Sequence, residues 1–151
     1  MVAVQRQDTI ERMNQRQNRC FYTSYSEMNE VLNRFATEAE ADDIWISAEI
    51  QELKENRSGK RLCQIVSMAL DTARRNCIET TPPRGRYIRI RCRDIQEQTL
   101  IKIQYSCEDR VIREFDKSII KMRDLIESSY GYLKIQLDSD VGCIKIAIPD
   151  A

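Results

Sequence analysis

The sequence contains no histidine in its 151 residues. Histidine is the commonest general base and proton shuttle near neutral pH, and its absence removes these roles as well as that of a phosphate acceptor. Serine, cysteine and lysine are present, but none stands in a recognisable arrangement with a base of suitable pKa. The residues therefore favour a protein without a catalytic site, and they exclude phosphotransfer to a histidine of this chain.

Cysteine pairs with metal-binding spacing are also missing. Six cysteines occur, but no two form a Cys-x-x-Cys pair, and there is no histidine to complete a zinc site. We expect neither a metal site nor a disulfide framework, and we interpret most of these residues as free thiols that pack as small hydrophobic groups. The cysteines are Cys20, Cys63, Cys77, Cys92, Cys107 and Cys143.

Neither sign of charge is in excess, and long hydrophobic runs are absent. Lysine and arginine number 24, as do aspartate and glutamate, so an electrostatic partner must meet a local patch rather than the whole chain. No apolar run approaches the roughly 18 residues of a membrane span, and the amino terminus lacks the apolar core of a signal peptide. We expect a cytoplasmic protein with no membrane partner.

The hydrophobic periodicity predicts helices and strands in a definite order. Every predicted strand has one apolar and one polar face, so we expect an α/β two-layer sandwich, with a mixed sheet covered on one face by helices. An N-terminal helix or helices precede this domain. A loose turn in "DIQEQ" and a turn in "DSDVG" complete two hairpins. The first expected helix starts at residue 26 and stops in the acidic stretch "TEAEADD", residues 37–43. The other expected helices cover 59–77 and 111–126, and the expected strands cover 44–50, 88–92, 101–105, 133–137 and 144–148.

Two segments carry a resemblance to a known family. Together with the element order, "QIVSMALDTARRN" and "IIKMRDLIESSYGYLKIQLDSDVGCIKIAIP" resemble the ATP-binding domain of bacterial sensor histidine kinases, the Bergerat or GHKL type. The resemblance covers roughly residues 36 to 150. It implies two parts: a helical segment over 1–35, which in the family connects to a dimerisation domain, and a histidine-kinase-like ATPase domain over 36–151.

The magnesium and phosphate positions of the family are altered in this chain. In the family, the helix after the first strand carries a glutamate and, four residues later, an asparagine that helps to hold magnesium; the matching residues are Met68 and Thr72. A thioether cannot ligate a hard cation, and a hydroxyl is a weaker ligand than an amide oxygen. The glycine-rich segment that wraps the triphosphate matches Glu114 to Ser118, which contains no glycine.

The adenine-reading motif of the family is altered as well. Its Asp-x-Gly-x-Gly pattern matches Tyr105, Cys107 and Asp109, within the segment "IQYSCEDR" that joins a strand to a helix without glycine or proline. No carboxylate remains at Tyr105 to accept the adenine amino group, and no glycine lets the backbone approach the base. The resemblance therefore predicts a degenerate nucleotide site, filled by packed side chains, with no bound cofactor.

Basic residues alternate along the polar faces of the predicted strands. On an open sheet they form a surface that fits an acidic protein or the phosphates of a nucleic acid. Outward charges also keep an open sheet soluble and protect its edges, which explains the same pattern without a partner. Few aromatic residues interleave the charges, so nucleic acid is the less favoured ligand. These residues are Arg89, Arg91, Arg93, Lys102, Lys134 and Lys145.

The N-terminal helix allows two interpretations. Phe21, Met28, Val31 and Phe35 form an apolar stripe that would bury a seam against a second copy of the chain. The same stripe would also pack back on its own domain. The residues do not separate a homodimer from this second arrangement.

The sequence thus favours a catalytically inactive histidine-kinase-like domain that acts as a protein-interaction or regulatory module in bacterial signalling. One alternative is a divergent sensor histidine kinase or ATPase that binds ATP through unfamiliar residues. Another is a nucleic-acid-binding domain that uses the basic sheet face.

Overall fold

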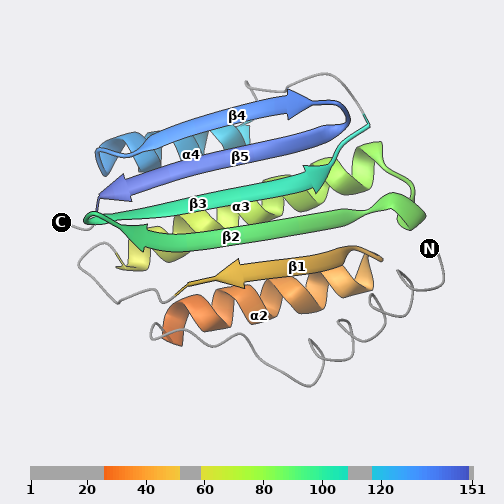
Figure 1. The fold of residues 1–151 in the computed structure, drawn as a ribbon, viewed down its shortest axis with the longest axis horizontal. Coiled ribbons are helices and arrows are strands. Elements are labelled where there is room, and N and C mark those ends of the chain that lie inside the picture. Colours follow the sequence, from red (N-terminus) through yellow and green to blue (C-terminus); the bar gives the residue numbers. More distant parts are fainter. Residues whose placement is uncertain (1–25, 52–58, 109–116, 150–151) are drawn as a thin grey trace.

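The computed structural model describes residues 26–51, 59–108 and 117–149, which form a sheet with helices packed on one face (Figure 1). The predicted α/β two-layer architecture is confirmed. The helices are α2 (Ser26–Ala41), α3 (Gly59–Thr80) and α4 (Lys117–Ser128), with a short 3-10 helix η1 (Pro83–Gly85). The strands are β1 (Trp45–Ile50), β2 (Tyr87–Ile95), β3 (Gln98–Ser106), β4 (Tyr132–Asp138) and β5 (Val141–Pro149).

The five strands of these ranges lie in the order β1-β2-β3-β5-β4. Strands β1 and β2 run parallel, and all other neighbours run antiparallel, so the sheet is mixed as predicted. After β3 the chain passes through α4 to the far edge of the sheet, and β5 then returns between β3 and β4 (Figure 1). This crossover makes β3 and β5 neighbours although α4 and β4 separate them in the sequence.

Both hairpins close with two-residue turns in which both residues have positive φ. Gln96 and Glu97 have φ values of 51° and 64°, and Ser139 and Asp140 have values of 47° and 65°. Turns of this kind match the twist of the paired strands. The loose turn predicted for the first hairpin is therefore wrong. In the second hairpin, Gly142 was predicted in the turn but lies buried in β5.

The described helices cover one face of the sheet (Figure 1). Helix α3 crosses the centre and packs on β2, β3 and β5, while α2 lies against β1 and α3, and α4 lies against β4 and α3. Ile65, Val66, Ala69 and Ala73 recur at helical spacing on α3 and are fully buried. Of the helices in the described ranges, none is long and apolar enough to cross a membrane.

Helix α2 ends at Ala41, within the acidic stretch of residues 37–43 in which the sequence predicts its end. Arg74 on α3 forms ion pairs with Glu38 and Asp42 in this stretch. This positive charge offsets the repulsion between the carboxylates at the end of the helix. The predicted domain boundary between residues 35 and 36 falls inside α2.

Arg86 joins the end of α3 to the segment after α2. Its guanidinium donates hydrogen bonds to the backbone oxygens of Ile78, Thr81 and Asp42, at 3.3, 2.8 and 2.9 Å. The first two carbonyls belong to the last turn of α3 and the residue after it, which have no partner further along the helix. A cation at this place also interacts favourably with the helix dipole.

Candidate functional site

The end of β3 and the facing part of α3 bring together positions that the resemblance assigns to nucleotide binding. Tyr105 points toward the helices and is 4% exposed. Its ring lies against Gly142, its register partner on β5, so closely that a Cβ added to Gly142 would overlap the ring. The ring therefore fills the space above Gly142 on the helix-covered face of the sheet.

The hydroxyl of Tyr105 is tied to α3 through a hydrogen bond with the side chain of Asn76. Burial raises the pKa of Tyr105 to about 12, and the hydrogen bond with Asn76 opposes this effect only in part. The phenol is therefore neutral near pH 7 and already engaged. It differs in both respects from a carboxylate that accepts a hydrogen bond from adenine.

The two positions that match the magnesium ligands are engaged in packing. Thr72 is 2% exposed, and its hydroxyl donates to the backbone oxygen of Met68 at 2.9 Å. Met68 packs against the hydrophobic core from a partly buried position. Among the described residues, no group of three or more histidine, cysteine, aspartate or glutamate side chains is placed to hold a metal ion.

The last residues of β3 are fixed by contacts to β5 and α3. The backbone N–H of Cys107 donates to the oxygen of Asp140 at 2.9 Å, which attaches this segment to the turn between β4 and β5. The sulfur of Cys77 lies 3.1 Å from the hydroxyl oxygen of Ser106, inside the core. Burial raises the pKa of Cys77, so its thiol is protonated near neutral pH.

The remaining predicted positions of the nucleotide site lie mostly outside the described residues. Asp109 lies outside the described residues, and of the segment from Glu114 to Ser118 the structure describes only the last two residues. Ser118 is half-buried in the first turn of α4. Sequence reasoning missed Asn76 and Gly142 as partners of Tyr105, although both lie in the two segments that carry the family resemblance.

The cysteines in the described ranges are free thiols, as predicted. Four are buried and Cys143 is half-buried, while Cys20 lies outside the described residues. Cys143 is on β5 and points to the open face of the sheet, between register partners Gln104 and Gln136. Burial raises its pKa, while the charges of Lys102 and Lys145 lower it in part.

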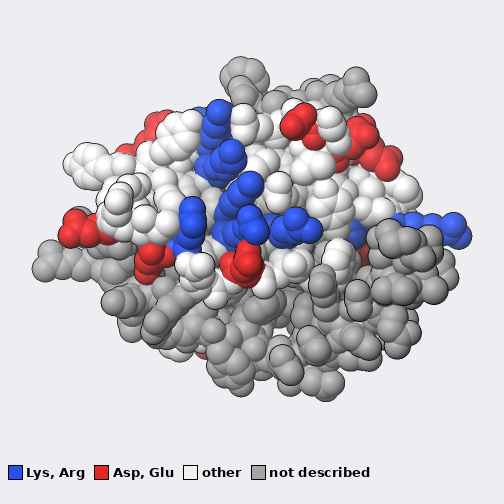
Figure 2. Space-filling view, in the orientation of Figure 1, with Lys and Arg blue, Asp and Glu red and all other residues white. Residues whose placement is uncertain are grey.

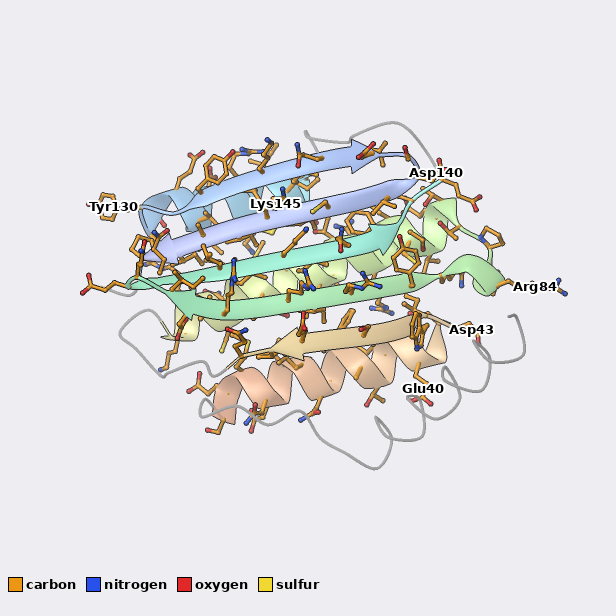
Figure 3. All side chains as sticks on the ribbon, viewed as in Figure 1. Glu40, Asp43, Arg84, Tyr130, Asp140 and Lys145 are labelled. Carbon is orange, nitrogen blue, oxygen red and sulfur yellow. The ribbon has the colours of Figure 1, made fainter. Side chains whose placement is uncertain are left out.

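A second candidate site is the open face of the sheet, opposite the helices. Lysine and arginine side chains gather in the middle of this face, with few acidic residues between them (Figure 2). Lys145 stands near the centre of the face (Figure 3). All six basic residues predicted for this surface lie on strands β2 to β5, at positions that alternate with buried ones.

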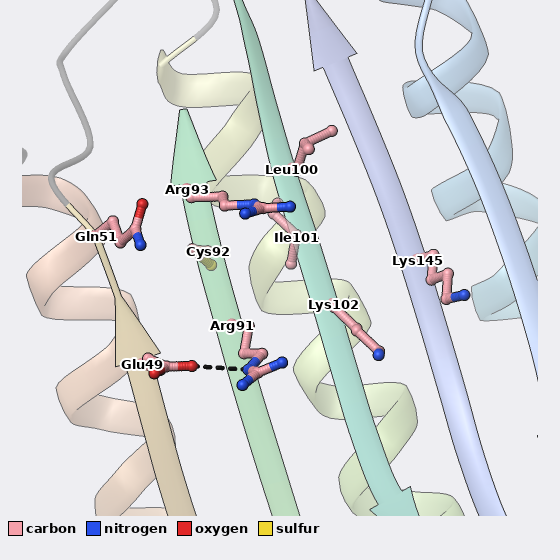
Figure 4. Close-up of a pocket in the computed structure, with 9 residues that line it drawn as sticks. All are labelled: Glu49, Gln51, Arg91, Cys92, Arg93, Leu100, Ile101, Lys102 and Lys145. Atoms are coloured by element: carbon pink, nitrogen blue, oxygen red, sulfur yellow. Dashed lines mark hydrogen bonds and ion pairs between the residues drawn. The ribbon is translucent and has the colours of Figure 1, made fainter. Parts of the chain in front are cut away.

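Four of these six residues form a single row across four adjacent strands. Arg91 pairs in register with Lys102, Lys102 with Lys145, and Lys145 with Lys134. We call these four residues the cationic row. On the edge strand β1, Glu49 is the register partner of Arg91 and ends the row with an ion pair of 2.7 Å between its carboxylate and the guanidinium (Figure 4).

Two hollows flank the cationic row, and both are bordered by Lys102 and Lys145. The first has a volume of about 550 Å³ and includes Leu100 and Arg93 (Figure 4). The second has a volume of about 590 Å³ and includes Val141, beside the β4–β5 turn. The face therefore consists of a charged ridge between two shallow, partly apolar depressions.

The N-terminal stripe packs within its own domain in this structure. Met28 is fully buried and Phe35 is 5% exposed, and both belong to the hydrophobic core. Val31 is partly buried against the same core. This is the second of the two arrangements that the sequence allowed, and Phe21 lies outside the described residues.

No protein-family model matches the chain. No curated protein matches it either.

Solved structures with a similar fold are numerous. The catalytic domain of the histidine kinase ThkA has a TM-score of 0.67 and 15% identity, and the match covers 85% of this chain and 93% of that domain. The histidine kinase AdeS of Acinetobacter baumannii has a TM-score of 0.68 and 12% identity, over 95% of this chain and 76% of AdeS.

A third match is a complex of histidine kinase ThkA with the response regulator protein TrrA. Its TM-score is 0.64 with 15% identity, over 86% of this chain and 41% of the matched chain. Identities at this level establish the fold alone. The similarity, together with the sheet order and the helices on one face, shows that the chain has the fold of a histidine kinase catalytic domain.

Proposed function

We propose that this domain is a degenerate, catalytically inactive member of the histidine kinase fold, retained as a cytoplasmic protein-interaction or regulatory module in bacterial signalling. The observation that carries the proposal is the packing of Tyr105. Its ring occupies the space above Gly142, and its hydroxyl is bound to Asn76, at the position where the family has its adenine-reading carboxylate.

The neutral state of Tyr105 supports this proposal. With a pKa of about 12, the phenol carries no charge near pH 7. It therefore cannot replace the charged acceptor that the adenine amino group meets in the family. Moving the ring aside for a nucleotide would expose a buried aromatic side chain and break its hydrogen bond with Asn76.

The magnesium positions support the proposal independently. The Thr72 hydroxyl donates to the backbone of its own helix, and Met68 supplies only a thioether. Magnesium demands a nearly octahedral set of hard oxygen ligands and gives up its water reluctantly. The sequence also contains no histidine, so this chain has no residue that could accept a phosphoryl group as the histidine of the kinases does.

Protein binding is the role that remains for such a domain. The histidine kinase ThkA, which has this fold, is seen in complex with the response regulator protein TrrA. By analogy, we place the present domain among modules that bind a signalling protein or a second copy of the chain. This role needs a specific surface and does not need bound nucleotide.

Thermal unfolding with millimolar MgATP tests the loss of nucleotide binding. A ligand held at 100 times its Kd stabilises the folded state by about 2.7 kcal/mol, which raises Tm by several degrees in a domain of this size. We expect no such rise. ATP is also a polyanion, so magnesium tripolyphosphate serves as the control for weak binding to the cationic row.

The outcomes of this experiment are distinct. A rise in Tm with MgATP that tripolyphosphate does not produce would overturn the proposal and favour a divergent ATP-binding kinase or ATPase. An equal, salt-sensitive rise with both anions would locate the binding on the open face and leave the proposal intact.

A further inference from the structure

The cationic row is an unfavourable arrangement for the isolated domain. Three neighbouring pairs in register, Arg91 with Lys102, Lys102 with Lys145, and Lys145 with Lys134, place like charges directly opposite each other. Such pairs destabilise a sheet. Mixed charges would keep the face equally soluble, so solubility alone does not explain why these four residues share one sign.

Edge protection does not explain the row either. Charged side chains guard the exposed edges of a sheet against pairing with other strands. Lys102 and Lys145, however, lie on β3 and β5, which have hydrogen-bonded neighbours on both sides. These two lysines form the middle of the row, where no edge needs protection.

The spacing of the row fits an acidic α-helix better than an extended peptide. Neighbouring strands lie about 4.8 Å apart, so the four positions span roughly 14 Å. On an α-helix, carboxylates one turn apart repeat at about 5.4 Å, so four of them span roughly 16 Å. Alternate residues of an extended strand repeat at about 6.7 Å and span roughly 20 Å, which the row does not match.

The hollows on either side fit the rest of such a helix. Leu100 in one hollow and Val141 in the other offer partly buried apolar surface beside the charged ridge. Apolar residues that flank an acidic stripe on an amphipathic helix would reach these depressions. Of the described residues that line the two hollows, none is aromatic, so neither hollow offers a surface on which a nucleic-acid base would stack.

Glu49 makes the two ends of the cationic row differ in charge. Its ion pair with Arg91 partly neutralises the end of the row at β1, while Lys134 at the β4 end has no acidic register partner. An acidic stripe is therefore attracted most strongly by Lys102, Lys145 and Lys134. Carboxylates that extended past Arg91 would meet Glu49 and be repelled.

We propose that the cationic row binds an acidic amphipathic helix of a partner protein, which lies across the strands with one carboxylate per turn over each basic residue. This inference rests on the proposed protein-binding role and names the chemistry of the partner. The binding is electrostatic in its specificity, with apolar contacts in the two hollows.

Binding of a labelled peptide, followed by fluorescence anisotropy, tests the inference. The probe is a helical peptide of about 20 residues with glutamates one turn apart, flanked by leucines. Its comparison peptide has the same composition and helicity, but its glutamates are spread around the helix. We expect the striped peptide to bind about tenfold more tightly, and its binding to weaken as salt rises from about 50 to about 300 mM.

Matched variants locate the binding site. Lys145→Glu reverses the charge in the middle of the row, and we expect it to weaken binding of the striped peptide about tenfold. Lys121→Glu makes the same change of net charge on an exposed position of α4, on the other side of the molecule, and should change binding less than about twofold. Glu49→Gln removes the repulsion at the β1 end and should tighten binding about twofold to threefold.

Three results would overturn the inference: equal binding of both peptides, equal losses in Lys145→Glu and Lys121→Glu, or tighter binding of single-stranded DNA than of the striped peptide. The last result would assign the row to nucleic acid. The nucleotide test has a separate readout. Stabilisation by MgATP with intact peptide binding would overturn the inactive-domain proposal alone, and loss of peptide specificity without nucleotide binding would overturn this inference alone.

Discussion

Tyr105 on β3 and Gly142 on β5 are register partners, and the tyrosine ring occupies the space that a side chain at position 142 would need. The glycine is not required by its backbone conformation, because none of the described glycines has a positive φ. It is required by the close approach of the ring. The pair thus forms one packed unit in the core, and its loss would open the region that the resemblance assigns to adenine.

Gly142→Ala should therefore destabilise the domain through the Tyr105 ring. The added methyl group overlaps an aromatic ring whose hydroxyl is hydrogen-bonded to Asn76. Overpacking of this kind costs about 1–3 kcal/mol of unfolding free energy. In a Tyr105→Leu background, where the ring is gone, the same substitution should cost at least about 1 kcal/mol less, as measured by urea unfolding. Equal costs in both backgrounds would contradict the proposed contact.

Tyr105 should also make stability fall at high pH. Burial raises its pKa in the folded state from its ordinary value near 10 to about 12. The folded state therefore holds this proton more tightly than the unfolded state, so its contribution is complete below pH 10 and is lost as the pH rises from about 10 to about 12. The free energy of unfolding, measured with urea, should fall more steeply over this pH window for the wild type than for Tyr105→Phe, which has no phenolic proton.

The control for this prediction is Tyr87→Phe, because burial also raises the pKa of Tyr87 from a less buried position. Tyr87→Phe should change the slope of the unfolding free energy against pH less than Tyr105→Phe does. Identical slopes for the wild type and Tyr105→Phe would mean that the phenol of Tyr105 ionises in the folded protein as it does in the unfolded chain.

Arg86 should be important for stability because its guanidinium serves three backbone oxygens. Arg86→Ala leaves the carbonyls of Ile78, Thr81 and Asp42 without this donor, and we expect it to lower the free energy of unfolding by about 2–3 kcal/mol. Arg86→Lys keeps the charge but not the planar fork, so it should recover less than half of that loss. Full recovery by lysine in urea unfolding would show that charge alone accounts for the effect.

The helices, strands and their apolar faces could be predicted from the sequence because they depend on local periodicity. Ile88, Ile90 and Cys92 alternate with three arginines, and the structure buries the first set and exposes the second. The ion pairs at the end of α2 could not be predicted in the same way. They depend on Arg74, which is more than 30 residues away from Glu38 and Asp42 and meets them only when α2 packs on α3.

The cationic row shows the same limit for a surface. The sequence identified Lys102, Lys134 and Lys145 as outward residues on separate strands, but it did not place them in one line. That alignment requires β5 to lie between β3 and β4, together with the register of each pair. Likewise, the contact of Tyr105 with Gly142 depends on the β3–β5 register, and the glycine was misassigned to a turn because turns are its commonest place.

Reversing a charge within the row should stabilise the isolated domain. Lys145→Glu converts two like-charge pairs, with Lys102 and with Lys134 on the adjacent strands, into two opposite-charge pairs. Each such cross-strand pair contributes about 0.2–1 kcal/mol, so we expect the free energy of unfolding to rise by about 0.5–1 kcal/mol at low salt. The gain should shrink as salt screens the charges.

Urea unfolding at two salt concentrations measures this effect, with Lys121→Glu on α4 as the control that should change stability by less than about 0.5 kcal/mol. A loss of stability in Lys145→Glu would contradict the repulsion inferred from the register. A gain, together with the expected loss of binding to the striped peptide, would show that the row lowers the stability of the free domain and is useful only when an acidic partner covers it. Natural proteins accept such local instability mainly at binding and catalytic surfaces.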